Sequence, residues 1–205
     1  MHFVTTNLFI PKFPLNAHLH KCQIFHRTQL LNGTEPLIVR LSNEGQINHP
    51  ICWWSLKNAK LEVGFQHNLT YFRKDAQGRR KRGSWKVRNT TYYVSRRNGP
   101  PTVRVKAYDD RGWLDEDVSE LYVVLFSSPY CFVMRTPLNY TAPLPSVDNA
   151  THKFPDNSRC LLWVPINTSG TTLQSCEEGF FAQCNNVGLY PYRYRKKVCE
   201  NEDKE

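Results

Sequence analysis

Seven cysteines give this chain its clearest chemistry, because paired thiols can form disulfide bonds. Five of them lie between Cys131 and Cys199, around two strand-like runs and one run, 175–186, with the spacing of a short helix. Cysteines clustered beside aromatic strands are typical of proteins folded in an oxidising compartment. Spacing alone does not choose among the connectivities, and with six cysteines paired a seventh, Cys22, is left over.

Glycosylation acceptors point to the same compartment. The sequence contains six Asn-x-Ser/Thr sequons, where its composition predicts roughly two by chance. They lie at Asn32, Asn68, Asn89, Asn139, Asn149 and Asn167. We therefore expect a secreted glycoprotein, although residues 1–21 lack the charged start, continuous apolar segment and cleavage site of a recognisable signal peptide.

Motifs for catalysis are absent from the sequence. It has no G-x-S-x-G, H-E-x-x-H, Walker or G-x-G-x-x-G pattern. His18 and His20 have no acidic or thiol ligands at metal spacing, and the acidic run at 109–117 lacks the EF-hand pattern, so a turn explains it better. We expect no enzyme activity, no metal and no cofactor.

The elements that position these residues are short runs rich in β-branched and aromatic residues. Eight such runs occupy 37–42, 51–57, 61–73, 84–95, 102–108, 119–126, 130–135 and 160–165. Asn98-Gly99 separates the fourth run from the fifth, which predicts a hairpin. In the fifth run, apolar Val103 and Val105 alternate with basic residues, as in an antiparallel sheet with one wet face.

Eight successive antiparallel strands followed by one helix favour an all-β, up-and-down barrel with the C-terminal helix outside. An immunoglobulin-like sandwich is the alternative, but the sequence lacks its Cys-Trp-Cys arrangement and tyrosine corner. We expect the barrel and helix to occupy 35–199, after an irregular lead-in at 1–34 and before a charged tail at 200–205. No apolar run approaches the roughly 18 residues needed to span a membrane.

From about Thr34 to Cys199 the chain resembles the tick salivary lipocalins, the histamine-binding-protein family. The resemblance rests on Cys52, Cys131-Phe132-Val133, Leu162-Trp163, Cys176, Phe180-Phe181, Cys184 and Cys199, in that order. It implies an eight-stranded lipocalin-type barrel with an outer C-terminal helix. It also implies disulfide bonds that join Cys52 to Cys199, Cys131 to Cys176 and Cys160 to Cys184.

The resemblance further implies a ligand inside the barrel. Amine-binding members carry Cys-Asp in the seventh strand and Glu-Leu-(Trp/Tyr) in the eighth, because a buried ammonium needs a carboxylate. Here Phe132 and Leu161 stand at those positions, and Glu62 and Glu120 are the alternative strand carboxylates. The candidate ligand-binding aromatics are Trp163, Tyr122, Phe126, Trp85, Trp54 and Tyr92. Period-2 alternation turns only one of Trp53 and Trp54 inward.

Basic residues are concentrated in one stretch. Ten lie between Ala76 and Tyr108, with no acidic residue, in a chain of net charge +9. They form a solvated hairpin face or attract an anionic ligand, acidic polysaccharide or host protein.

We expect a monomeric, secreted protein of tick saliva that sequesters a small host mediator and so suppresses host defence. An amine such as histamine or serotonin is the family expectation, and a leukotriene or fatty acid is the alternative. Neither nucleic acid nor membrane is an expected partner.

Overall fold

The computed structural model describes residues 28–95, 100–137, 158–185 and 187–200. Its strands are β1 (Leu37–Glu44), β2 (Ile51–Leu61), β3 (Gly64–Arg73), β4 (Ser84–Val94), β5 (Thr102–Tyr108), β6 (Glu120–Ser128), β7 (Cys131–Arg135), β8 (Arg159–Pro165) and β9 (Tyr190–Arg193). Its helices are α2 (Gly170–Cys184), α3 (Lys196–Cys199) and the 3-10 helix η1 (Arg80–Arg82). None of the helices in these ranges is long and apolar enough to cross a membrane.

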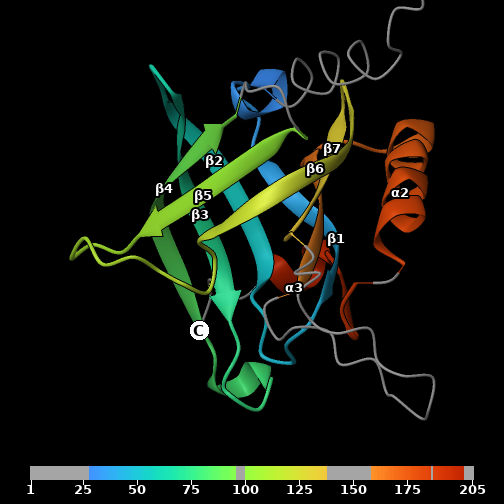
Figure 1. Ribbon diagram of the computed structural model, residues 1–205. Helices are drawn as coiled ribbons and strands as arrows, with labels where there is room; N and C mark the ends of the chain where they lie inside the picture. Colours follow the sequence, from blue (N-terminus) through green and yellow to red (C-terminus); the bar gives the residue numbers. More distant parts are fainter. Residues whose placement is uncertain (1–27, 96–99, 138–157, 186, 201–205) are drawn as a thin grey trace, which may run out of the picture.

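Strands β1 to β8 form a closed antiparallel barrel. Each strand from β2 to β7 pairs with the next, and β1 closes the ring by pairing with both β8 and β2. Helix α2 packs outside the barrel beside β6, β7 and β8 (Figure 1). The predicted lipocalin-type fold, an eight-stranded barrel with an outer helix, is therefore confirmed.

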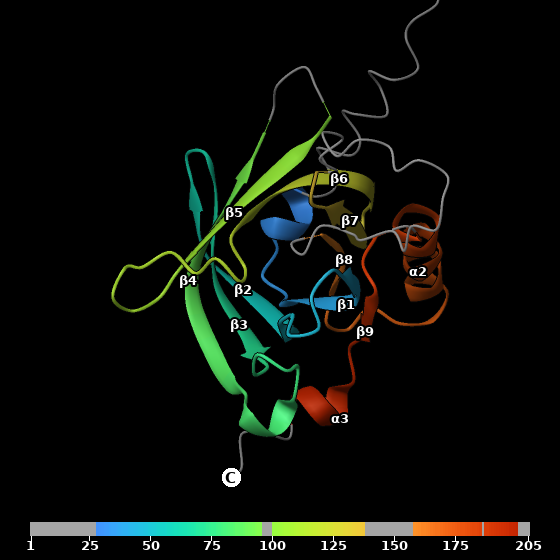
Figure 2. The same cartoon turned by 60° about the horizontal axis from the view of Figure 1, so that its bottom comes forward.

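Several element boundaries differ from the prediction. The run 61–73 divides at a turn, because β2 ends at Leu61 and β3 begins at Gly64, whose φ of 151° suits glycine. Helix α2 begins five positions before the predicted helix, which started at Ser175. Strand β9 was not predicted. It pairs with the part of β1 that lies beyond the β1–β2 pairing, and α3 follows it (Figure 2). The lead-in also contains a helical turn at 28–31.

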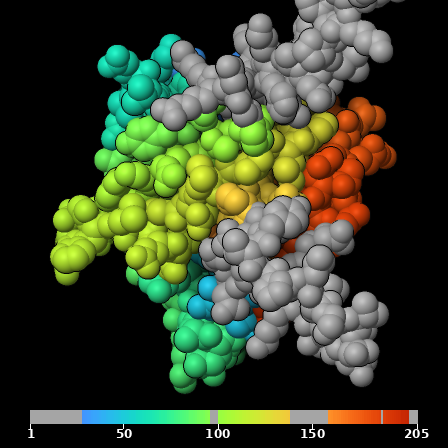
Figure 3. Space-filling model, viewed as in Figure 1, coloured from blue at the N-terminus to red at the C-terminus, as the bar shows by residue number. Residues whose placement is uncertain are grey.

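Strands β7 and β8, whose sequences are continuous apolar runs, are buried on both faces. In β7, Phe132 faces the barrel interior while Val133 packs outward with Phe180 of α2. The helix buries Cys176, Phe180 and Cys184, which are four residues apart and so share one face. In the view of Figure 3, β4, β5 and β6 occupy much of the visible surface and α2 borders them. Outward positions of β5 such as Arg104 and Lys106 are polar, whereas β4 also turns the apolar Trp85 and Val87 outward.

Three disulfide bonds fasten the C-terminal elements to the barrel. Cys131–Cys176 joins β7 to α2, Cys160–Cys184 joins β8 to the end of α2, and Cys52–Cys199 joins β2 to α3. These are the pairs that the family resemblance implies. Cys22 and the sequons at Asn139 and Asn149 lie outside the described residues.

Candidate ligand-binding site

Aromatic side chains meet inside the barrel. They are Trp53, Tyr71, Tyr92, Tyr122, Phe132 and Trp163, and all are buried. Trp163 lies among them: its ring stacks on Phe132, with centroids 6.3 Å apart, and meets Trp53 edge to face at 5.9 Å. The indole Nε1 of Trp163 is buried and has no hydrogen-bond partner among the described residues. The interior is therefore a packed aromatic core that contains an unsatisfied donor.

Three of the six candidate aromatics lie in this interior: Trp163, Tyr122 and Tyr92. The other three, Trp54, Trp85 and Phe126, lie on the outside of the barrel. Trp85 is seven positions from Tyr92 on β4, an odd separation that places the two side chains on opposite faces. Two positions after the inward Val124, Phe126 would also face inward, but a bulge between them in the β6–β7 pairing turns it toward α2.

Trp53, rather than Trp54, is the inward member of its pair. Trp54 lines an outer pocket of about 470 Å³ together with Trp85, Tyr194 and Glu200. Sequence reasoning left the choice between Trp53 and Trp54 open, because each face of β2 carries an apolar residue, Ile51 on one face and Leu56 on the other.

A directed chain of hydrogen bonds crosses one part of the interior. His67 Nε2 lies 2.9 Å from the carbonyl oxygen of Leu31, so Nε2 carries the proton and donates it. His67 Nδ1 must then accept from Ser55 Oγ at 3.0 Å, and Ser55 Oγ accepts from the Tyr92 hydroxyl at 3.1 Å. Burial lowers the pKa of His67 to about 4. This neutral histidine fastens the helical turn at 28–31 to β2, β3 and β4.

A buried ion pair occupies another part of the interior. Arg159 Nε donates to Glu44 Oε2 at 2.6 Å, and the guanidinium lies 5.3 Å from the Trp53 ring centroid, a cation–π contact. Arg159 Nη1 also donates to the Tyr122 hydroxyl at 3.4 Å and to the Asp117 carbonyl at 2.9 Å. Burial raises the pKa of Glu44, while Arg159 opposes that rise. Burial alone would lower the pKa of Arg159, but Glu44 raises it above its usual value.

A second paired carboxylate lies beside a pocket of about 340 Å³ that Arg88, Asp115 and Asp117 help to line. Asp115 Oδ2 accepts hydrogen bonds from the Tyr71 hydroxyl and from Arg88 Nε. Burial would raise the pKa of Asp115, but these two donors hold it below its usual range. Arg73 Nε lies 2.8 Å from Asp117 Oδ2 at the same place. Arginines thus balance these carboxylates.

The positions where an amine binder of the resembled family would carry acids are apolar. Phe132 and Leu161 both face the interior, as that resemblance implies, and both are buried. Glu62 lies in the exposed β2–β3 turn and does not enter the barrel. Glu120 begins β6 half-buried, and its Oε1 accepts a bond from the Leu121 amide.

Sequence reasoning missed Glu44, Arg159 and His67. Strand parity could have found Arg159, because it lies four positions before Trp163 on β8 and so shares its inward face. Glu44 carried no such signal, since a bulge between Val39 and Leu41 shifts the parity of β1. In the described part of the chain, no group of three or more His, Cys, Asp or Glu side chains could hold a metal ion.

The basic stretch does not form one surface. Arg88 turns toward Asp115, whereas Arg80 in η1 lies beside α3 and donates to the Val198 carbonyl. Arg96 and Arg97 lie outside the described residues. Binding of acidic polysaccharide or a host protein by this stretch stays a prediction.

Comparison with known proteins finds similarity in fold to a solved structure, and none in sequence. No protein-family model matches the sequence, and no curated protein matches it. The fold is similar to that of Japanin from Rhipicephalus appendiculatus, solved bound to cholesterol, with a TM-score of 0.48 and 14% sequence identity. The match covers 79% of this chain and 92% of that one. At this identity no residue role transfers, so function must be inferred from the side chains of this chain.

Proposed function

We propose that this chain is a secreted lipocalin-type protein that binds a small host mediator inside its barrel and sequesters it, as members of the tick salivary family do. The unpartnered Nε1 of Trp163 carries the proposal. More than about 90% of buried polar groups have a hydrogen-bond partner, so an unpaired donor among aromatic rings is a place where a ligand would bind. Tyr92 and Tyr122 lie in the same aromatic core and would complete the lining.

The interior favours a ligand with an apolar body and a hydrogen-bond acceptor over a protonated amine. An ammonium in this low-dielectric space would need an uncompensated carboxylate. Glu44 is already paired with Arg159, and Asp115 with Arg88. A lipid mediator such as a leukotriene or fatty acid fits better than histamine or serotonin, because its hydroxyl or protonated carboxyl oxygen could accept from Trp163, whereas an ionised carboxylate would meet the same cost of burial as an ammonium.

Secretion and glycosylation are part of the same proposal. Three disulfide bonds support folding in an oxidising compartment. The sequon asparagines within the described residues, Asn32, Asn68, Asn89 and Asn167, are all exposed. Asn68 and Asn89 face each other across β3 and β4, so two glycans would stand side by side on the outer wall.

Calorimetric titration of the oxidised, secreted protein tests the ligand. Leukotriene B4 and arachidonic acid should bind saturably and quench tryptophan fluorescence, whereas histamine and serotonin should bind far more weakly. Tight amine binding without lipid binding would overturn the ligand class. Absence of saturable binding by all four compounds would overturn sequestration inside the barrel.

The Trp163→Phe variant tests the site. It keeps an aromatic ring but removes the indole donor, and loss of one hydrogen bond should weaken lipid binding roughly 2-fold to 12-fold. Trp113→Phe is the matched control, because Trp113 is 73% exposed. Equal affinity of the two variants would place the ligand away from Trp163.

A further inference from the structure

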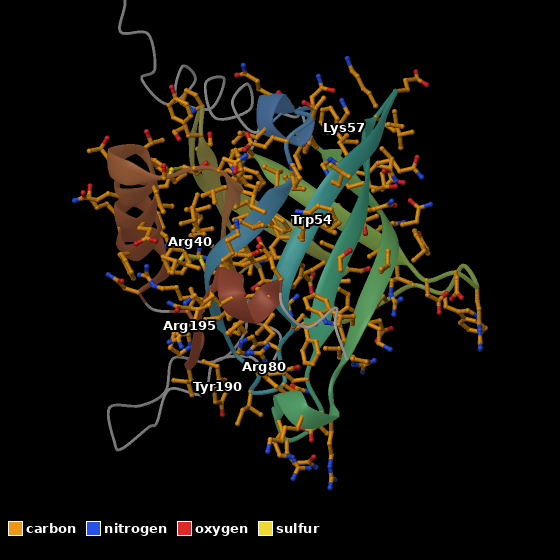
Figure 4. The ribbon with its side chains drawn as sticks, turned by 180° about the vertical axis from the view of Figure 1, so that it is seen from behind. Arg40, Trp54, Lys57, Arg80, Tyr190 and Arg195 are labelled. Atoms are coloured by element: carbon orange, nitrogen blue, oxygen red, sulfur yellow. A yellow bond between two sulfur atoms is a disulfide. The ribbon has the colours of Figure 1, made fainter. Side chains whose placement is uncertain are left out.

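A pocket on the outside of the barrel has a chemistry unlike that of the interior. Its volume is about 690 Å³, within the usual range for small-molecule sites. Side chains from β1, β9, α2, α3 and the segment after β3 meet around it. Figure 4 shows two of its residues, Arg80 and Arg195, beside α3. The pocket thus joins segments that are far apart in the sequence.

The charged side chains that line this pocket are all basic. They are Lys74, Arg80, Arg193 and Arg195, and among the residues that the structure describes no aspartate or glutamate lines it. The Arg195 side chain makes no ion pair with the described residues, and Arg193 bonds Glu177 from an exposed position. Lys74 Nζ donates to the Ile47 carbonyl at 2.6 Å, which fixes its ammonium beside the pocket. An anion would therefore meet several cations.

The rest of the lining is mostly apolar. Leu41, Ile51 and Phe180 are buried residues of this wall, and Phe181 is 48% exposed at its edge. His49 is neutral, because burial lowers its pKa to about 4. A ligand here would need both an acidic group and an apolar body.

We propose that this pocket binds an amphipathic organic anion, with its acidic group at Arg193, Arg195 and Lys74 and its apolar part against Ile51 and Phe180. The site is separate from the barrel interior and does not depend on the ligand proposed there. An acidic polysaccharide would satisfy the cations but leave the apolar wall uncovered.

Dodecanoate provides the test, because it combines a carboxylate with an alkyl chain. The Arg193→Gln/Arg195→Gln variant should bind dodecanoate at least tenfold more weakly than the unmodified chain in calorimetric titrations at low salt. Lys60→Gln/Arg111→Gln is the matched control, since it removes the same charge at exposed positions outside this pocket and should leave the affinity unchanged. Raising the salt concentration should weaken binding to the unmodified chain.

Three outcomes would overturn the proposal. Equal losses in the two double variants would show attraction by net charge alone. Binding of dodecanol as tight as that of dodecanoate would show that the cations play no part. Loss of dodecanoate binding in Trp163→Phe, with no loss in Arg193→Gln/Arg195→Gln, would place the anion inside the barrel. Loss of dodecanoate binding in Arg193→Gln/Arg195→Gln, with no loss in Trp163→Phe, supports the external pocket whether or not the barrel binds a mediator.

Discussion

The two buried histidines should make this protein less stable as the pH falls from 7 to 5. His49 and His67 are only 5% and 1% exposed, and burial lowers the pKa of each to about 4. Protonation of His67 would place a proton on Nδ1, which could then no longer accept the hydrogen bond from the Ser55 hydroxyl. The folded state therefore resists a proton that the unfolded chain accepts readily.

The sign and size follow from proton linkage. Both histidines have a reference pKa of 6.5, so below that pH the unfolded state binds protons that the folded state does not bind until about pH 4. Each such group removes about 1.4 kcal/mol of stability per pH unit within this window. From pH 6.5 to 5, each histidine should lower the free energy of unfolding by about 2 kcal/mol. That stability is present above pH 6.5 and is lost on acidification.

Urea unfolding of the disulfide-intact protein, followed by tryptophan fluorescence at several pH values, measures this loss. His67→Gln can keep both bonds, since its amide nitrogen can donate to Leu31 and its oxygen can accept from Ser55. That variant and His49→Gln should each lose about half of the pH dependence, and the double variant nearly all of it. A double variant that keeps the original slope between pH 7 and 5 would refute the assignment.

Three further variants test the packing. Arg159→Met should cost about 3–5 kcal/mol in urea unfolding, because it leaves Glu44 charged and buried, and adding Glu44→Gln should restore most of the loss; additive losses would contradict a coupled pair. Replacing both Cys131 and Cys176 by alanine opens a loop of sequence separation 45 and should cost about 4 kcal/mol, measured in the same way; an unchanged midpoint would contradict this. Gly179→Ala would place a Cβ 2.9 Å from a ring carbon of β6, so a loss of about 1 kcal/mol is expected, and a gain in thermal stability would contradict the tight contact.

Strand periodicity and turn residues were enough to predict the barrel. Alternation in Val103 and Val105 located a strand with one wet face, and the apolar runs after Cys131 and Cys160 located the two strands that α2 covers. Helix α2 itself was placed too late, because Thr171 and Thr172 are weak helix formers and its first turn has no side-chain cap to mark it. Strand β9 is four residues long and gains its stability by pairing with β1, a contact that no local pattern reveals.

The interior site was predicted only in part, and the missed residues show why. Arg159 lies an even number of positions from Trp163 on β8, so alternation would have predicted that it faces inward. Nothing in the sequence indicates that Glu44 lies opposite it. The bulge before Phe126 reverses an alternation that the sequence alone would continue. Bulges and distant ion pairs depend on how strands align, and that alignment is set by the packing of the whole barrel.

The separation of charge between the two sites follows from the cost of burying ions. Glu44 faces Arg159 inside the barrel, and Asp115 faces Arg88 beside the pocket of about 340 Å³, so these paired charges cancel, whereas the described lining of the external pocket carries cations and no acid. The net charge of +9 therefore does not indicate the charge of the barrel ligand, but it does indicate that the outer surface attracts anions. Recognition in the interior must depend on shape and on the Trp163 donor, and should change little with salt. Recognition outside must depend on Coulomb attraction, which salt screens over about 10 Å at 0.1 M. A ligand that needed both an unpaired cation and an enclosed aromatic space would find them only at different places on this chain.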